Sequence, residues 1–252
     1  MHSFEHYRDR YPNIWFERRG AVVQLRLHTQ GDSLKWGALD GSVHTQLGDA
    51  FRDLARDAAV RCLILTGTGS SFCAELDPKE LPSGPAGPDW TRLMREGRDL
   101  LMNFLDIDVP VVSAVNGPAY IHSELPVLAD IVLASTAAEF ADLAHFAYGV
   151  VPGDGVHVVW PMLLGPNRGR YFLFSGQKIG AEEARSLGVV SEVLSPERLE
   201  ARSWELAVAI AGKPEAVLRG TRAALTHSIR KRLLEELGAG LALEGLALLT
   251  RN

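Results

Sequence analysis

Residues 107–135 read IDVPVVSAVNGPAYIHSELPVLADIVLAS and contain two short apolar runs separated by a turn and a longer connection. The runs, Val111–Val115 and Asp130–Ala134, are continuous rather than alternating, which is typical of strands that are covered on both faces. Asn116-Gly117-Pro118 predicts a turn directly after the first run. Buried strands joined in this way, within a chain that alternates strands and helices, predict an α/β fold.

The same alternation continues toward the N-terminus. Arg61–Thr66 (RCLILT) predicts another buried strand, and Ile14–Arg18 with Ala21–Leu27 predicts a hairpin that turns at Arg19-Gly20. Apolar residues recur with a period of 3.6 over Leu39–Leu54 and Trp90–Asp106, which predicts two half-buried helices. The first two thirds of the chain therefore alternate strands with helices.

The remainder of the chain is mostly helical in pattern. Helices are predicted over Ala181–Leu187, Pro196–Ala211, Pro214–Ser228 and Leu233–Leu249, with the cationic cluster Ile229–Arg232 as a solvated junction between the last two. We accordingly expect a core over residues 1–195 and a C-terminal helical region over residues 196–252. The last helix is apolar on nearly all sides, so it must bury against its own domain or another subunit.

Composition excludes several classes of function. The chain has 252 residues, a formal net charge of −5 and no dominant basic stretch, which argues against a nucleic-acid or membrane partner. The N-terminus is polar, and no run of about 18 apolar residues predicts a membrane span. The two cysteines, Cys62 and Cys73, have neither disulfide nor metal-ligand spacing, so we expect reduced thiols and a cytoplasmic protein.

Two histidines and an aspartate on loops suggest a hydrolase that activates water. His145 and Asp154 lie nine residues apart, joined by an apolar run and a Pro-Gly-Asp-Gly turn. A carboxylate that holds an imidazole fixes its tautomer and prepares it as a general base. His145 could instead be a structural histidine, and Asp154 could cap the helix that follows it. A second histidine, His122, follows the Asn116-Gly117-Pro118 turn.

Three motifs in fixed order carry a family resemblance. TGTGSSFCAELD at 66–77, VNGPA at 115–119 and VVPGDG at 150–155 resemble the crotonase (enoyl-CoA hydratase/isomerase) superfamily, and the resemblance extends over residues 14–249. Membership implies a crotonase-like ββα spiral core with a C-terminal helical region that mediates trimerisation. Trimers of this superfamily are often paired into hexamers, so a homotrimer or hexamer is expected.

Within the superfamily the chain is most similar to the β-diketone hydrolases, of which 6-oxocamphor hydrolase is the example. The similarity lies around Trp36, His122, His145, Asp154 and Glu244. Two departures from the CoA-ester enzymes point the same way. Where those enzymes have three successive glycines this chain has residues 120–123 (YIHS), which cannot approach a thioester oxygen as closely, and His145 replaces a catalytic glutamate.

The resemblance implies hydrolysis of a carbon–carbon bond in a cyclic or bicyclic β-diketone by a retro-Claisen reaction, with a small-molecule diketone as partner and no cofactor or metal. His145 is expected to be the base, Asp154 its orienting partner, and His122 the hydrogen-bond donor to the oxygen that gains charge. His122 could alternatively face solvent. The expected substrate contacts are Trp36, Glu244, Ala74 through its backbone N–H, and Leu81.

Several alternatives remain open from the sequence. Trp36 is equally compatible with the apolar core, and Glu244 with an exposed stripe of its helix or an intersubunit contact. The proline-rich segment Leu81–Asp89 is either a mobile lid or a surface loop. Glu124 aligns with a glutamate of the hydratases, which keeps an acyl-CoA hydratase or isomerase open as the second function. A catalytically silent scaffold is the third.

Overall fold

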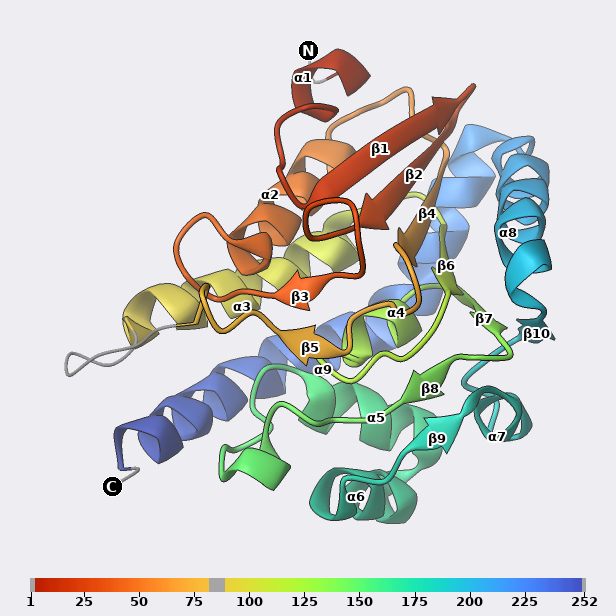
Figure 1. Ribbon diagram of the computed structural model, residues 1–252. Helices are drawn as coiled ribbons and strands as arrows, with labels where there is room; N and C mark the ends of the chain where they lie inside the picture. The colour runs from red at the N-terminus through yellow and green to blue at the C-terminus, as the bar shows by residue number, and fades with distance from the viewer. Residues whose placement is uncertain (1–2, 82–88, 251–252) are drawn as a thin grey trace.

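The computed structural model describes residues 3–81 and 89–250. Its centre is a six-stranded sheet in the order β1-β2-β4-β6-β7-β10 (Figure 1). The antiparallel hairpin β1–β2 forms one edge, and the other neighbouring pairs are parallel. The strands are β1 (Ile14–Arg19), β2 (Val22–Leu27), β4 (Cys62–Gly67), β6 (Val111–Val115), β7 (Ile131–Ser135) and β10 (Glu192–Leu194).

Helices cover both faces of this sheet. Strand β4 shows the reason, since Cys62 and Ile64 pack with Trp204 of α8, whereas Leu63 and Leu65 join the larger core on the opposite face. A strand that is buried on both faces favours apolar residues at successive positions, which explains the apolar run Cys62–Leu65. The larger core includes helices α2 (Val43–Ala55), α3 (Trp90–Asp106), α4 (Glu124–Val127), α5 (Val156–Leu164) and α9 (Glu215–Leu249), and the smaller core includes α8 (Pro196–Ala211).

Short strands follow the main ones and turn the chain into a spiral. In succession β2 leads to β3 (Lys35–Trp36) and α2, β4 leads to β5 (Glu75–Leu76) and α3, and β7 leads to β8 (Glu139–Phe140). β3 pairs with β5, and β8 pairs with β9 (Ile179–Gly180). The remaining elements are α1 (Phe4–Tyr7), η1 (Phe146–Tyr148), α6 (Pro166–Ser175) and α7 (Ala181–Ser186). The expected α/β class and ββα spiral are confirmed.

The prediction of two separate helices at the C-terminus is wrong. Residues 215–249 form one helix, α9, which passes through Ile229–Arg232 without a break. No glycine or proline stands in that cluster to stop a helix. Arg230 is also not merely solvated, because it donates to the Leu105 carbonyl at 3.2 Å and pairs with Asp106 at the end of α3.

Other differences from the sequence prediction are local. The helix expected from Leu39 begins at Val43, because Gly41 adopts φ +77° and interrupts the backbone before it. The strands of two or three residues were not predicted, since they are too short to show a period. In the segment Leu81–Asp89, residues 82–88 lie outside the described residues. Both cysteines are buried free thiols, as expected.

No helix in the two described ranges combines the length and apolarity that a membrane crossing requires.

Candidate active site

A cavity of about 390 Å³ lies between α3, α9 and the loops that follow β6 and β8. Its walls are largely apolar and include Leu76, Leu81, Trp90, Leu93, Ile121, Tyr148, Val150, Leu241 and Leu248. Its polar residues are Trp36, His44, His122, His145, Asp154 and Glu244. Folding thus brings together every expected site residue except Ala74, which does not occur among the described residues of the lining.

The turn after β6 presents His122 to the cavity. Asn116 holds this turn, because its side-chain amide donates to the carbonyls of Gly69 and Ser71 at 3.0 Å. His122 itself has φ +48°, a left-handed conformation that costs a non-glycine residue about 1 kcal/mol. The conformation occurs at the position where the side chain enters the cavity, which is typical of functional sites.

His145 lies between two carboxylates. Its Nε2 is 3.2 Å from Asp154 Oδ2, so the expected contact between these residues exists. Its Nδ1, however, is 2.7 Å from Oδ1 of Asp142, a residue that the sequence analysis did not single out. The spacing Asp-x-x-His was the available signal. The tautomer of His145 therefore depends on two acids rather than one.

Asp154 also contacts the second histidine. Its Oδ2 is 3.3 Å from His122 Nδ1, and that same nitrogen is 2.8 Å from Glu124 Oε1. All five side chains are buried. The groups Asp142, His145, Asp154, His122 and Glu124 thus form a continuous series, which we call the carboxylate–imidazole chain. The two imidazoles share its central carboxylate.

Glu244 reaches the site because α9 approaches the loop before α5 very closely. A Cβ atom built on Gly240 would lie 2.6 Å from His157 Nε2 and still closer to the Gly153 carbonyl oxygen, so only glycine fits at this crossing. One helical turn later, Glu244 Oε1 is 3.8 Å from His145 Nε2. The glycine crossing therefore decides how near this carboxyl group lies to His145.

The electrostatic environment of the cavity gives its acidic side chains different pKa values. Burial alone would lower the pKa of His145, but the carboxylates of Asp154 and Asp142 outweigh it and hold that pKa well above its ordinary value. Burial would raise the pKa of Asp154, but the facing His145 and His122 outweigh it and lower that pKa. Burial and the Asp154 charge raise the pKa of Glu244 to about 8. At neutral pH Asp154 is an anion and Glu244 a neutral acid.

His44 is a pocket residue that the sequence analysis missed. Its Nδ1 lies 3.3 Å from Glu96 Oε2, and Arg92 Nη1 approaches the same oxygen to 2.6 Å. Burial lowers the pKa of His44, so this ring is neutral at neutral pH. Trp36 stacks on His122 with ring centroids 4.0 Å apart and an interplanar angle of 33°. On a predicted helix of mixed polarity His44 carried no signal of its own.

Part of the carboxylate–imidazole chain has the spacing of a metal site. One ligand atom each from His122, Glu124 and Asp154 lies within 4.8 Å of the others. The separation of 2.8 Å between His122 Nδ1 and Glu124 Oε1 is that of a direct hydrogen bond, and we describe the group as hydrogen-bonded.

The loop at residues 120–123, which lacks the glycines of the CoA-ester enzymes, uses its backbone donors internally. The N–H groups of Tyr120 and Ile121 both donate to the Cys73 carbonyl, at 2.8 and 3.1 Å. They are therefore engaged and not directed at a ligand. His122 is the next residue along, and its side chain supplies a donor where the backbone does not.

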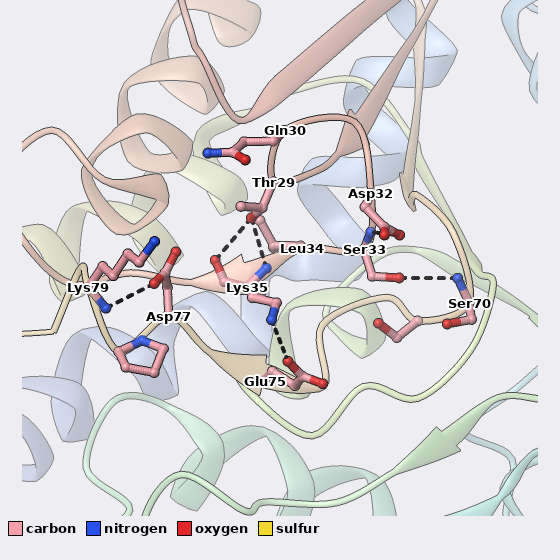
Figure 2. A pocket seen from close by; sticks show the side chains of 12 residues that line it. Thr29, Gln30, Asp32, Ser33, Leu34, Lys35, Ser70, Glu75, Asp77 and Lys79 are labelled. Carbon is pink, nitrogen blue, oxygen red and sulfur yellow. Dashed lines mark hydrogen bonds and ion pairs between the residues drawn. The ribbon is translucent and has the colours of Figure 1, made fainter.

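A larger cleft of about 770 Å³ lies beside β3 and β5 (Figure 2). Figure 2 shows Lys35 facing Glu75, with Nζ 2.9 Å from Oε2, and Ser33 accepting from the Ser70 N–H at 3.1 Å. Its other charged residues are Asp32, Asp77 and Lys79. None of the expected site residues occurs in the described lining of this cleft, and its Lys35–Glu75 contact, which raises the pKa of Lys35, is an exposed ion pair that keeps the lysine charged. We therefore place the candidate active site in the smaller, apolar cavity.

Comparisons with known proteins agree with the fold and with the site. The family model for enoyl-CoA hydratase/isomerase matches residues 17–244. The chain is 30% identical to the 1,2-epoxyphenylacetyl-CoA isomerase of Escherichia coli over 181 residues, 70% of this chain and 69% of that protein. It is 32% identical to the carnitinyl-CoA dehydratase of Citrobacter koseri over 202 residues, 77% of this chain and 73% of that protein.

Two solved structures are similar over nearly the whole chain. One is a β-diketone hydrolase from the cyanobacterium Anabaena sp. bound to (S)-3-oxocyclohexyl acetic acid, with a TM-score of 0.89 and 43% identity over 97% of this chain and 96% of that one. The other is an enoyl-CoA hydratase/isomerase from Mycobacterium paratuberculosis, with a TM-score of 0.84 and 26% identity over 96% of each chain. The chain is thus similar both to enzymes named for CoA thioesters and to one named for β-diketones.

Proposed function

The chain belongs to the enoyl-CoA hydratase/isomerase family, and we propose that within this family it hydrolyses a carbon–carbon bond of a cyclic β-diketone. One observation carries the proposal. The walls of the cavity are largely apolar, its polar residues include two buried imidazoles held by carboxylates, and its described lining contains no lysine or arginine. Such a cavity suits an uncharged cyclic molecule whose two carbonyl oxygens face the imidazoles.

The reaction assigns a different task to each histidine. Nε2 of His145 accepts a proton from water, and the oxygen of that water forms a bond to one carbonyl carbon. The resulting tetrahedral centre collapses, the bond to the carbon between the two carbonyls breaks, and its electron pair forms an enolate. His122 donates a hydrogen bond to the enolate oxygen. The enolate carbon then takes up the proton, which leaves a carboxylic acid and a ketone in one molecule.

The protonation states constrain this scheme. His145 must lose the proton on Nε2 before that nitrogen can accept one from water. The flanking carboxylates raise its pKa, so the reactive form becomes more abundant as the pH rises. Glu244, with a pKa raised to about 8, is a neutral carboxyl group at neutral pH and can donate a hydrogen bond to the substrate.

A diketone of known shape follows from the Anabaena neighbour. The keto acid bound to that protein is (S)-3-oxocyclohexyl acetic acid. Joining its acid carbon, with loss of water, to the ring carbon that is beside the ketone and opposite the substituted carbon gives bicyclo[2.2.2]octane-2,6-dione. We propose this dione, or one of similar size, as a substrate here. Its hydrocarbon frame would contact the apolar wall that includes Leu81 and Leu241.

An acyl-CoA enzyme is the second candidate. The curated relatives named above favour it. The resemblance favours it too, because it implies that Glu124 aligns with a glutamate of the hydratases. In this chain, however, Glu124 is bonded to His122, and the loop N–H groups of residues 120 and 121 are engaged with Cys73. The anionic phosphates of CoA would also meet no cationic side chain in the described lining of the cavity.

The test is hydrolysis of the dione in the absence of CoA. The reaction is monitored through the loss of the diketone absorbance, and the product is identified as the keto acid. We expect His145→Ala and Asp154→Asn to lose about 10²–10⁴-fold in kcat while folding normally. His227→Ala, an exposed histidine of α9, is the matched control and should keep full activity. Wild-type rates in both site variants would refute the dyad. Acyl-CoA binding by calorimetry without dione turnover would favour the second candidate. A protein that neither hydrolyses the dione nor binds acyl-CoA would be a catalytically silent scaffold.

We also propose that the protein acts as a homotrimer or hexamer in the cytoplasm. Helix α9 exposes large apolar side chains, each between 56% and 73% accessible to solvent: Leu225, Leu234, Leu243, Leu246 and Leu249. Large apolar side chains left exposed on a helix are typical of surfaces that another subunit covers. Sedimentation equilibrium would measure the assembly, and a monomer at micromolar concentration would contradict the proposal.

A further inference from the structure

The carboxylate on the Nδ1 side of His145 has no role in the scheme above. Asp142 is only 2% exposed, and its Oδ1 is 2.7 Å from His145 Nδ1, the shortest contact in the carboxylate–imidazole chain. A buried carboxylate is costly unless it is paired. Asp142 Oδ1 forms its close hydrogen bond with His145 Nδ1 and accepts a longer one from the Ala144 N–H at 3.4 Å.

The backbone holds Asp142 in place from both sides. The N–H of Ala141 donates to the Ala119 carbonyl at 3.2 Å, and the N–H of Leu143 donates to the Tyr120 carbonyl at 3.0 Å. Asp142 is therefore pinned to the loop that also carries His122. Its carboxylate is part of a rigid frame and not a mobile surface group.

This placement determines which nitrogen of His145 faces the substrate. Because Nδ1 is held by Asp142, Nε2 is the nitrogen directed at Asp154, at 3.2 Å, and at Glu244, at 3.8 Å, both of which line the cavity. A neutral imidazole that keeps its proton on Nδ1 has its lone pair on Nε2. That is the tautomer a base needs if it accepts a proton on the cavity side.

We propose that Asp142 is the positioning residue of His145: it holds the Nδ1–H and thereby presents an unprotonated Nε2 to the nucleophilic water. The proposal rests on the proposed function for its kinetic consequence, but the tautomer of the ring does not depend on any substrate. It leaves Asp154 with a separate task, because this carboxylate faces the reactive nitrogen of His145 and Nδ1 of His122 at once.

The titratable groups around His145 come from four segments. Asp142 lies on its own loop, Asp154 precedes α5, Glu244 lies on α9, and His122 follows β6. Replacing Asp142 removes one of the two carboxylates nearest the ring and leaves the other three groups in place. The effect on His145 is therefore separable from a general change in the charge of the cavity.

The first experiment uses the wild-type protein without substrate. Nitrogen-15 NMR of the imidazoles reports which nitrogen of His145 carries the proton in the neutral ring. We expect Nδ1–H with Nε2 unprotonated above the pKa of His145. An Nε2–H tautomer would overturn the proposal without any variant having to fold.

The second experiment compares wild type with Asp142→Asn, which keeps the shape and one acceptor oxygen but removes the charge. We expect the pKa of His145, followed by the same NMR signals, to fall by about 1–3 units, while the signals of exposed His227 keep their positions. With the dione, kcat should fall about 10³–10⁴-fold with little change in KM, since the amide also supports the wrong tautomer.

The outcomes separate the two proposals. A folded Asp142→Asn protein with the wild-type pKa of His145 and the wild-type pH profile would refute the positioning role. If wild type fails to hydrolyse any diketone but the tautomer and the pKa change are as expected, the proposed function is wrong and the positioning role stands.

Discussion

The glycine crossing between α9 and the loop before α5 allows a quantitative test of how the site is assembled. Ordinary contact begins near 3.4 Å, and a Cβ on Gly240 would lie 2.6 Å from His157 Nε2 and closer still to the Gly153 carbonyl. The Gly240→Ala protein must therefore open this crossing by roughly 1 Å, and overpacking of this kind costs about 1–3 kcal/mol. Because one of the clashing atoms belongs to the backbone, a side-chain rotation alone cannot relieve the strain.

Gly238→Ala is the matched control on the same helix. Gly238 is exposed, and a Cβ built on it meets nothing within 4 Å. This variant should be stabilised by up to about 1 kcal/mol, since alanine favours a helix more than glycine does. The steric cost of Gly240→Ala is the difference in unfolding free energy between the two variants, which we expect to be about 1–3 kcal/mol by urea denaturation.

The same shift should reach the chemistry. Glu244 follows Gly240 by one helical turn, so opening the crossing moves its carboxyl group away from His145. A displacement of about 1 Å in a catalytic arrangement costs on the order of 10²-fold in rate. We expect kcat on the dione to fall by about 10–100-fold in Gly240→Ala and not in Gly238→Ala. Equal stability and equal kcat in the two variants would refute the argument.

Three further predictions follow from named contacts. Arg222→Ala should lower the unfolding free energy by about 3 kcal/mol, because the buried guanidinium donates to Asp130 at 2.7 Å and to carbonyls at the end of α3. Arg219→Ala removes more exposed ion pairs and should lower it by less than about 1 kcal/mol; urea denaturation measures both variants. His122→Gly should be more stable than His122→Ala by about 1 kcal/mol in thermal unfolding, since residue 122 has φ +48°, and a difference of zero would argue against strain there. The value of kcat/KM should rise with pH through an apparent pKa above about 6.5, because His145 must lose its proton before it can act as a base. The stability that its imidazolium contributes is complete below about pH 6.5 and is lost as the pH rises through the raised pKa of His145. A value of kcat/KM and an unfolding free energy that both stay constant between pH 6 and 9 would contradict these two expectations.

Burial on both faces explains why the main strands could be predicted from the sequence. Such strands consist mostly of apolar residues in a continuous run, as in Cys62–Gly67 and Val111–Val115. The strands at 35–36 and 75–76 could not be predicted, because two residues carry no periodicity. The predicted break between two helices at Ile229–Arg232 does not occur, because a charged cluster does not stop a helix when its residues are good helix formers.

The candidate site could be predicted in its residue types more than in its connections. His122, His145, Asp154, Glu244 and Trp36, which the resemblance singled out, all line one cavity. The Asp142 contact was not foreseen, although Asp142 stands three residues before His145. A local pair of this kind forms only if the backbone between the two residues turns to bring them together, and spacing alone does not reveal that turn.

Amino-acid order settled the α/β class and the family, because apolar runs and turn motifs are local properties that survive without knowledge of any contact. It also supplied the acids and imidazoles of the cavity. Which carboxylate meets which imidazole nitrogen was decided by the fold, since Asp142 is placed by hydrogen bonds to residues 119 and 120, and Glu244 by a helix that crosses Gly153 nearly ninety residues away in the chain. Those distances depend on packing between segments remote in sequence, and packing is a property of the folded chain.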